Sequence, residues 1–267
     1  MIAISTIILA LTIVIPPGKA SARHPLLPAA HTADTIDVPV GSPLIDGRRM
    51  TAFTTHLQVH RMIEGTSTLV QEARNTITFG DSAGRAVTRV VSNGEVRGPN
   101  GTRAAVSNFT FDRRTLELLS ASLPGPNGSM IVRNDGQGLH LSMRGAAAPM
   151  DVPLSQRSFY GPWSDYVVEE LPMREGAVYR VALWRPAGSP TAMTASVEKH
   201  LYVVRGREDV EVFGKTHKAW IVDDRTEDGS KLLGTMYIVD GPPKLVRWTI
   251  NTPDGSTVQI DQEVVTK

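Results

Sequence analysis

Most of this chain alternates between apolar and polar residues with a period of two. That period is typical of β-strands that bury one face, and the segments are rich in β-branched and aromatic residues, which strands favour. Asn-Gly and Asp-Gly pairs, which suit tight turns between antiparallel strands, separate many of the segments. The pattern predicts an all-β, mostly antiparallel fold, built as a strongly curved meander sheet or half-barrel. Clear examples are TTHLQVHRM, ASVEKHLYVV, HKAWIVDD and LVRWTI.

One segment follows a helical period instead. Large apolar residues recur at every fourth position, namely Phe159, Trp163, Val167 and Leu171. Pro162 suits the first turn of a helix, and Pro172 would end it. We therefore expect one short amphipathic helix at about 162–171, lying against the sheet.

This helix divides the strands into two sets. We expect one curved β-sheet domain over residues 46–267, and the alternative is two half-sheet domains at 46–158 and 172–267. Residues 23–45 contain several prolines and show little periodicity. They are interpreted as an extended N-terminal lead-in with one strand at Thr35–Val40.

The N-terminal segment is apolar from Ile2 to Ile15 and is followed by two prolines and then Ala20-Ser21-Ala22. As a helix it would span roughly 21 Å, which is short of the roughly 30 Å of a bilayer core. A short apolar run before a small-residue cleavage site is typical of a secretory signal. We expect a signal peptide at residues 1–22, and the alternative is an uncleaved short anchor.

The chain contains no cysteine, and its 28 Lys and Arg residues nearly balance its 27 Asp and Glu residues. Disulfides, thiolate nucleophiles and cysteine metal ligands are therefore excluded. The balanced charge offers no electrostatic footprint for nucleic acid or for an anionic membrane surface. With the predicted signal, this composition predicts a periplasmic or secreted protein of a bacterial envelope, with no cofactor, no nucleic-acid partner and no integral membrane span after signal cleavage.

The segment Gly80-Asp81-Ser82-Ala83-Gly84 matches G-x-S-x-G, the turn that carries the nucleophilic serine of many esterases. In those enzymes a helix follows the serine, whereas Arg85–Val91 alternates like a strand. We interpret the motif as a β-hairpin turn in which Gly80 and Gly84 take positive φ and Ser82 is solvated. The expectation is a protein without enzymatic activity, and a serine hydrolase that uses Ser82 is the alternative.

Two further groups of residues could suggest a metal site. His56 and His60 share one face of a strand but lie roughly 13 Å apart, too far to bind one ion. The acidic stretch Asp223–Gly229 lacks the register of a calcium loop and lies between two strong strands. We expect surface histidines and a solvated hairpin tip, and no metal site.

Acidic residues also lie on the predicted helix, at Asp165, Glu169 and Glu170. A carboxylate pair could perform acid–base chemistry. Because the apolar stripe lies on another side of the helix, we expect these acids to form its solvent-exposed face.

The C-terminal half resembles a known family. The matching stretches are LPMREGAVYRVALW, VEVFGKTHKAWIVDD and TMYIVDGPPKLVRWTI, with FDRRTLELLSAS upstream. The family is an uncharacterised domain of secreted bacterial proteins, similar to the β-rich half-barrel of the LolA-like and LppX-like periplasmic lipoprotein carriers. The resemblance covers roughly residues 50–264. It implies a concave apolar face that binds acyl chains and is closed by helices.

A strongly curved sheet cannot fill its own concave side with short side chains, so it must close on a helix, another sheet or a ligand. The candidate ligand-binding residues are Trp163, Val167, Trp220, Val246 and Trp248. In the strand around Trp248, Val246 and Ile250 would share its face. We expect an apolar ligand, such as a lipid or a lipoprotein acyl chain, or an envelope partner, and the alternative is a structural or interaction domain with a filled core.

Overall fold

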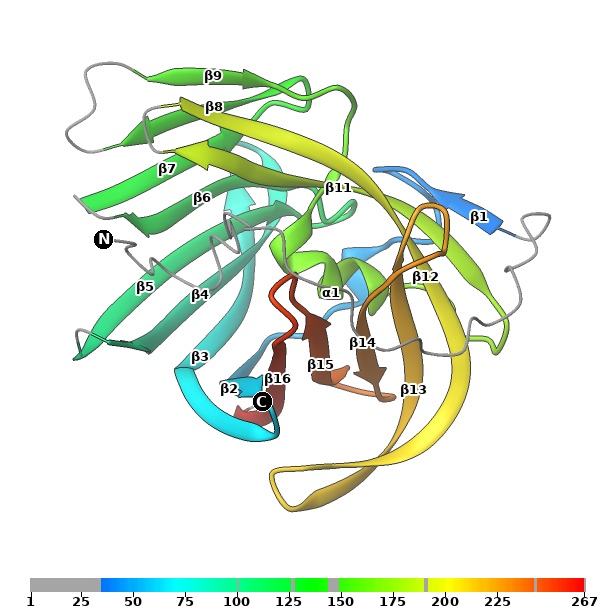
Figure 1. Cartoon of the computed structure of the whole chain (residues 1–267). Helices are drawn as coiled ribbons and strands as arrows, with labels where there is room; N and C mark the ends of the chain where they lie inside the picture. Colours follow the sequence, from blue (N-terminus) through cyan, green and yellow to red (C-terminus); the bar gives the residue numbers. More distant parts are fainter. Residues whose placement is uncertain are drawn as a thin grey trace.

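The computed structural model describes residues 35–99, 101–125, 128–143, 149–189, 192–242 and 244–266. The predicted signal peptide at 1–22 and residues 23–34 of the lead-in lie outside the described residues. Sixteen strands form one sheet (Figure 1). The helical elements are three to five residues long, and none of the described helices could cross a membrane.

The elements follow one another along the chain with these bounds. The first eleven are β1 (Thr35–Val38), η2 (Gly47–Arg49), β2 (Phe53–Ile63), β3 (Thr66–Ser82), β4 (Arg85–Gly98), β5 (Gly101–Asp112), β6 (Leu118–Gly125), β7 (Gly128–Asn134), β8 (Gly138–Met143), β9 (Met150–Pro153) and β10 (Phe159–Tyr160). The others are η3 (Gly161–Trp163), α1 (Ser164–Val168), β11 (Val178–Ser189), β12 (Ala192–Val212), β13 (Lys215–Thr226), β14 (Leu232–Ile238), β15 (Leu245–Asn251) and β16 (Thr257–Thr266).

Two antiparallel meanders make up the sheet. Hydrogen-bonded neighbours follow the order β1-β11-β12-β13-β14-β15-β16-β2-β3-β4-β5-β6-β7-β8-β9, and β10 pairs with β11 outside this path. β16 pairs with β2, which joins the C-terminal meander to the N-terminal one. Among the described strands, only β1 and β10 pair in parallel, each with β11. The predicted all-β, mostly antiparallel curved sheet is confirmed. In the described ladder β9 has no second hydrogen-bonded neighbour, so the sheet is not closed, although β12 passes beside β9.

The strand expected at Thr35–Val40 is present as β1 and ends at Val38, just before Pro39. A proline has no N–H to donate to a ladder, so the strand stops there. β1 pairs in parallel with β11 and lies at one edge of the sheet. The end of the lead-in is therefore part of the sheet.

Residues that pair directly across neighbouring strands share one face of the sheet, so the ladders show which side chains lie on the concave face. One row crosses the eight strands from β2 to β9 and consists of Phe53, Ile77, Val90, Phe109, Ala121, Val132, Leu141 and Met150. All but Met150 at the sheet edge are buried. The ring of Phe109 lies 4.7 Å from that of Trp163 between centroids. This apolar row is therefore the surface on which the helical segment packs.

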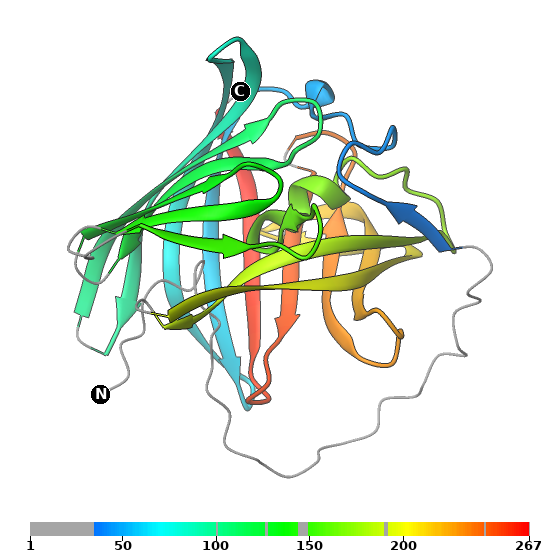
Figure 2. The same ribbon diagram turned by 90° about the horizontal axis from the view of Figure 1, so that it is seen from above.

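The helical segment lies inside the curve of the sheet. Figures 1 and 2, viewed at right angles to each other, both place α1 within the ring of strands. η3 and α1 together span residues 161–168, so the helix expected at about 162–171 is present but ends earlier. The amides of Glu170 and Leu171 bond to carbonyls three residues back, which tightens the last turn before Pro172.

The expectation of a solvent-exposed helix face is wrong. Every residue from Trp163 to Leu171 is buried, and Asp165, Glu169 and Glu170 expose only 5%, 9% and 4% of their surface. A helix on one face of a flat sheet keeps a wet side, whereas this helix is enclosed because the sheet curls around it. The acids of α1 therefore lie in the interior.

A second small core lies outside the curve. The long hairpin of β12 and β13 bends over β14–β16, where Lys215 Nζ lies 2.9 Å from Glu263 Oε2 and the ring of Phe213 lies 5.3 Å from that of His56. This core contains Val210, Val212, Ala219 and Val246. It covers the convex face of the C-terminal meander.

The placement of Val246 differs from the prediction. Leu245 and Trp248 belong to the main core, whereas Val246 lies in the second core on the convex side. The register of the β14–β15 ladder shifts between Tyr237 and Ile238. Because such a shift turns a side chain to the other face of a sheet, Val246 does not share the concave face with Trp248.

The G-x-S-x-G segment forms a hairpin turn. β3 ends at the exposed Ser82, the turn residues Ala83 and Gly84 have φ of 54° and 79°, and β4 follows directly. Gly80 does not take positive φ, contrary to the expectation, because it lies within the ladder, paired with Val87. A Cβ at Gly80 would meet the guanidinium of Arg89, which is the mobile end of a long side chain and would have to shift.

The acidic stretch Asp223–Gly229, which begins within β13, is only partly a solvated tip. The turn lies at residues 227–229, whereas Asp223 and Asp224 are buried within β13. Asp224 Oδ1 lies 2.6 Å from His200 Nδ1 and accepts its hydrogen bond, and Asp223 pairs with Arg205. The prediction is therefore wrong for these two residues, because the strand continues past them into the interior of the ladder.

The two histidines of β2 have separate partners. His56 Nε2 lies 2.8 Å from Glu72 Oε1, and His60 Nδ1 lies 3.1 Å from Ser67 Oγ. In the described parts of the chain, no group of three or more His, Cys, Asp or Glu residues is placed to hold a metal ion.

Ser82 is predicted to have no nucleophilic role. A strand rather than a helix follows it, so the turn lacks the helix N-terminus that would stabilise an oxyanion. We expect no stoichiometric labelling by a fluorophosphonate probe, for the wild-type protein or for Ser82→Ala. Labelling that is present in the wild type and lost in Ser82→Ala would contradict this prediction.

Candidate binding site

The candidate site lies where η3 and α1 meet the concave face. Trp163, Val167 and Trp248 belong to the main core cluster, and Trp220 packs against it with a partly exposed side chain. Four of the five residues predicted from the sequence therefore lie in or against one core, and Val246 does not. Their role in binding stays a prediction.

Aromatic rings form a continuous run on one side of the helix. Centroid distances are 4.6 Å from Trp184 to Tyr160, 6.2 Å from Tyr160 to Phe109, 4.7 Å from Phe109 to Trp163 and 5.2 Å from Trp163 to Tyr166. These rings come from β11, β10, β5, η3 and α1. Tilted contacts at such distances stabilise by about 0.5–1.5 kcal/mol beyond the burial of area. The run fixes the helical segment between two parts of the sheet.

The other end of the helix is fixed by polar contacts with the turn before β15. Lys244 Nζ donates to Glu170 Oε1 at 2.6 Å and to the Glu169 carbonyl at 2.9 Å. The backbone N–H of Leu245 donates to Glu169 Oε1 at 3.0 Å. These contacts join residues about 75 positions apart and hold α1 against the C-terminal meander.

Two acids of the helical segment have pKa values raised into the neutral range. Burial raises the pKa of Asp165 to about 7. Burial, and then the negative charge of Asp165, raises the pKa of Glu169 to about 8. A carboxyl in its neutral form can donate a hydrogen bond, which an ionised one cannot.

A second polar group faces the helix from β12 and β13. Burial, and next the carboxylate of Asp224, raises the pKa of Tyr202 well above its ordinary value. Ser164, Arg185 and Asp165 also lie close enough to act on this phenol. His200 is buried and bonds to Asp224 through Nδ1. The start of α1 therefore meets a polar surface as well as an aromatic one.

Many polar atoms of this region are buried without a hydrogen-bond partner within the described protein. They are Tyr160 OH, Trp163 Nε1, Asp165 Oδ1, Glu170 Oε2, Trp184 Nε1, Arg185 Nε and Trp248 Nε1. A buried polar group left unpaired costs about 1–3 kcal/mol, and such groups are rare in folded proteins. Most of these atoms are donors, so the region can offer hydrogen bonds to an acceptor.

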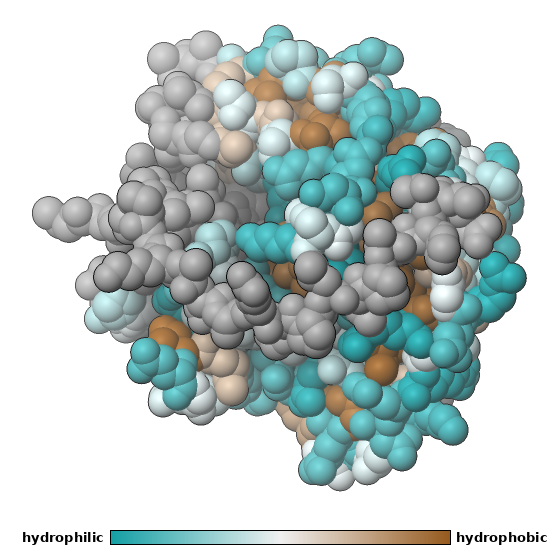
Figure 3. All heavy atoms as spheres, turned by 45° about the vertical axis from the view of Figure 1, so that its right-hand side comes forward, coloured by the Kyte–Doolittle hydropathy of each residue, from teal (hydrophilic) through white to brown (hydrophobic). Residues whose placement is uncertain are grey.

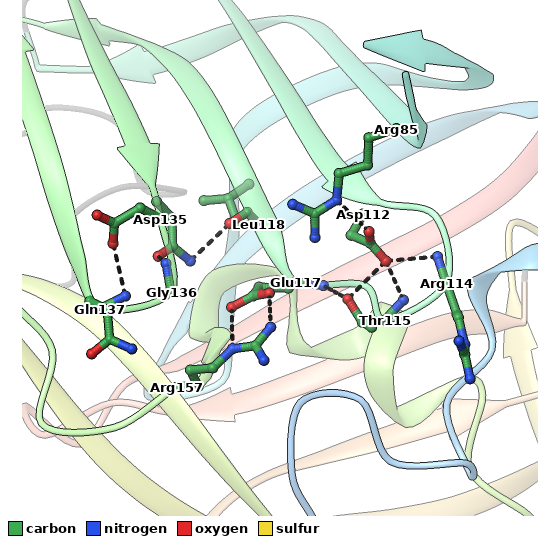
Figure 4. Close-up of polar contacts among 11 residues, drawn as sticks. Arg85, Asp112, Arg114, Thr115, Glu117, Leu118, Asp135, Gly136, Gln137 and Arg157 are labelled. Carbon is green, nitrogen blue, oxygen red and sulfur yellow. Dashed lines mark hydrogen bonds and ion pairs between the residues drawn. The ribbon is translucent and has the colours of Figure 1, made fainter. Parts of the chain in front are cut away.

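A polar cluster elsewhere in the chain provides a contrast (Figure 4). Around the β5–β6 turn, the Arg157 Nε donates to the buried Glu117 at 3.2 Å, and Arg85 Nε donates to Asp112 at 2.7 Å. Asp112 also accepts from the backbone N–H groups of Arg114 and Thr115. These carboxylates are paired with partners of the same chain, which is typical of a structural role. The region around α1 is different, so it is the better candidate for a binding site.

This polar region has little signature in the sequence. Asp165, Glu169 and Glu170 follow the spacing of an exposed helix face, and His200 and Tyr202 lie in an ordinary alternating strand. The distinguishing feature is that a segment with both apolar and acidic residues is buried on every side. Only the curl of the sheet produces that burial.

Comparisons with known proteins assign no family. No protein-family model matches the chain, and no curated protein matches it. The fold is similar to a beta-barrel-like protein of the domain of unknown function DUF1849 from Brucella abortus, with TM-score 0.42, 11% identity and coverage of 81% of this chain and 98% of that one. It is also similar to the hypothetical lipoprotein YmcC from Escherichia coli, with TM-score 0.33, 8% identity and coverage of 78% and 87%. Both TM-scores are below 0.5, so these likenesses assign neither an activity nor a ligand.

Trp163→Ala is predicted to destabilise the protein strongly. The change removes a buried indole that contacts Phe109 and Tyr166, and it should lower the free energy of unfolding by about 3–5 kcal/mol. Trp220→Ala is the matched control, because Trp220 also lies at the core but is partly exposed, and its loss should be clearly smaller. Urea unfolding measures both variants. Equal losses of unfolding free energy in the two variants would contradict the buried position of Trp163.

The raised pKa values of Asp165 and Glu169 predict a pH dependence. The two carboxyls keep their protons in the folded protein at pH values at which the unfolded chain releases them. Their contribution to the free energy of unfolding is therefore fully present below about pH 4 and is lost as pH rises through about 7 to 8. Each group would contribute a slope approaching about 1.4 kcal/mol per pH unit in this window.

Asp165→Asn and Glu169→Gln remove the titration but keep the shape, so their unfolding free energies should fall less between pH 5 and 8 than that of the wild type. Asp228→Asn, in an exposed turn, is the control and should leave this slope unchanged. If both core variants kept the pH dependence of the unfolding free energy seen in the wild type, the raised pKa values of these carboxyls would be contradicted.

Proposed function

We propose that this chain is a non-enzymatic protein of the bacterial envelope that binds an apolar ligand on the concave face of its curled sheet. The observation that carries the proposal is a mismatch between the length of the concave face and the short helix that covers it. The hairpin at Gly80–Gly84 supports the absence of catalysis. The apolar N-terminal run supports the envelope location.

The mismatch follows from the dimensions of the elements. Fifteen strands in series, about 4.8 Å apart, have a contour of roughly 70 Å, which curls into a ring roughly 23 Å across. That width holds one helical layer between two walls. The eight residues of η3 and α1 rise roughly 12–16 Å, whereas a strand of twelve residues such as β13 runs roughly 40 Å. The helical segment therefore covers only part of the concave face.

Apolar side chains extend beyond the helical segment on the C-terminal meander. Trp220, Ile250, Ile260 and Val264 lie on the concave face of β13, β15 and β16, pack against the main core and remain partly exposed. On the face of the molecule in Figure 3, by contrast, apolar residues are scattered among hydrophilic ones. The concave face is therefore the better surface for an apolar ligand.

The continuous aromatic run favours one alternative, a structural or interaction domain whose interior is filled by its own side chains. The two functions differ in whether the protein takes up a ligand. Native mass spectrometry of protein from its own envelope would identify a ligand that co-purifies.

We predict that the delipidated protein binds a fluorescent fatty acid in a saturable manner. Ile260→Glu places a charge on the concave apolar face and should weaken this binding at least about tenfold, because burying an unpaired carboxylate is costly. Val106→Glu is the control, since Val106 is exposed on the convex face and binding should be unchanged. Fluorescence titration measures both, and urea unfolding checks that both variants are folded. Failure of the wild type to take up the probe would favour the filled-core alternative.

A further inference from the structure

Polar residues cross the concave face of the N-terminal meander in a single row. Thr55 of β2 pairs directly with Asn75 of β3, Asn75 with Ser92 of β4, and Ser92 with Ser107 of β5. All four are buried. They lie two residues along each strand from the apolar row that contacts the helical segment, so they share its face. We call these four residues the polar belt.

Apolar and small residues flank the polar belt on both sides. Toward the helical segment lie Phe53, Ile77, Val90 and Phe109, and on the other side lie Leu57, Ala73, Gly94 and Ala105. Valine or alanine at the belt positions would continue this apolar surface at lower cost, since a buried polar group is unfavourable without a partner. The belt therefore interrupts an apolar face with residues that local packing does not require.

Two oxygens of the belt have no hydrogen-bond partner within the described protein, namely Thr55 Oγ1 and Asn75 Oδ1. Two more on the same face of β3 and β4, Gln71 Oε1 and Thr88 Oγ1, are also unpartnered. The amide oxygens of Asn75 and Gln71 only accept hydrogen bonds. A molecule that satisfies them must supply O–H or N–H donors.

The absence of charge around the belt further limits the chemical class of the ligand. None of the twelve residues in the belt and the two flanking rows is charged. A carboxylate or phosphate placed there would be desolvated without a counter-charge, which is strongly unfavourable. A neutral group with several hydroxyls has the donors that the oxygens require and avoids that cost.

We propose that the polar belt binds the head of a neutral, hydroxyl-bearing amphiphile, whose chain lies on the adjoining apolar surface. This inference rests on the proposed function, because it assigns a head-group site to the same concave face. Thr55 and Asn75 determine the specificity, and the apolar positions supply most of the affinity.

The test compares two probes of equal chain length, a monoacylglycerol and a fatty acid, as competitors of a fluorescent fatty acid on the delipidated full chain. The wild type should bind the monoacylglycerol at least about tenfold more tightly, the effect of one or two well-formed hydrogen bonds. Thr55→Val and Asn75→Leu should reduce this preference to about twofold or less and leave the affinity for the fatty acid nearly unchanged.

Thr54→Val is the matched control, because Thr54 is the neighbour of Thr55 on the convex face and bonds to Thr76 there. It should keep the full preference. Urea unfolding of Thr55→Val should give a stability equal to or above that of the wild type, since the change removes an unpartnered hydroxyl. If Asn75→Leu does not fold, Thr55→Val alone decides the test.

The outcomes separate the two proposals. Equal binding of both probes by the wild type, or a preference that survives Thr55→Val, overturns the head-group site and leaves the proposed function standing. Binding of neither probe overturns the proposed function together with this inference.

Discussion

The structure depends on one constraint, which is that the concave side of a curled antiparallel sheet has to be covered. Fifteen strands in series curve around a helical segment of eight residues, and the apolar row from Phe53 to Met150 packs against that segment. The rings of Trp163, Tyr160 and Phe109 lie at the centre of this contact. Because the sheet surrounds the segment, even a helix with acidic residues is buried on all sides.

Burial of those acids changes their chemistry. Asp165 and Glu169 lose the hydration that would stabilise their charged forms, so their pKa values rise toward neutrality and above. Glu170 instead meets Lys244, which ties the helical segment to the turn before β15. The helical segment is thus held by aromatic contacts on one side and by polar contacts on the other, and the two meanders are joined through it as well as through the β16–β2 ladder.

The concave face is chemically uneven. It is aromatic and acidic around the helical segment, polar but uncharged along the belt from Thr55 to Ser107, and apolar and partly exposed on β13, β15 and β16. A core that served only stability would gain from uniform apolar packing, since unpartnered buried oxygens such as Asn75 Oδ1 are unfavourable. This division into apolar and polar zones matches the two ends of an amphiphile, which is the basis of the proposed binding function.

The sequence by itself determined the strands, the tight turns and the existence of the short helix. Those features depend on local rules: a period of two, glycine at positive φ in a turn such as Ala83-Gly84, and proline at the ends of a helix. The same rules placed Trp163, Val167 and Trp248 on the apolar faces of their elements, and all three lie in the main core.

The tertiary structure alone decided which faces are buried. A register shift in the β14–β15 ladder moved Val246 to the convex side, and the curl of the sheet buried Asp165 and Asp224. The polar belt appears only when β2, β3, β4 and β5 are aligned in register, because its four residues come from four strands and each alone is a single polar residue among apolar ones on its strand face. Periodicity shows that a strand has two faces, but only the packing of distant strands determines which of them is inside.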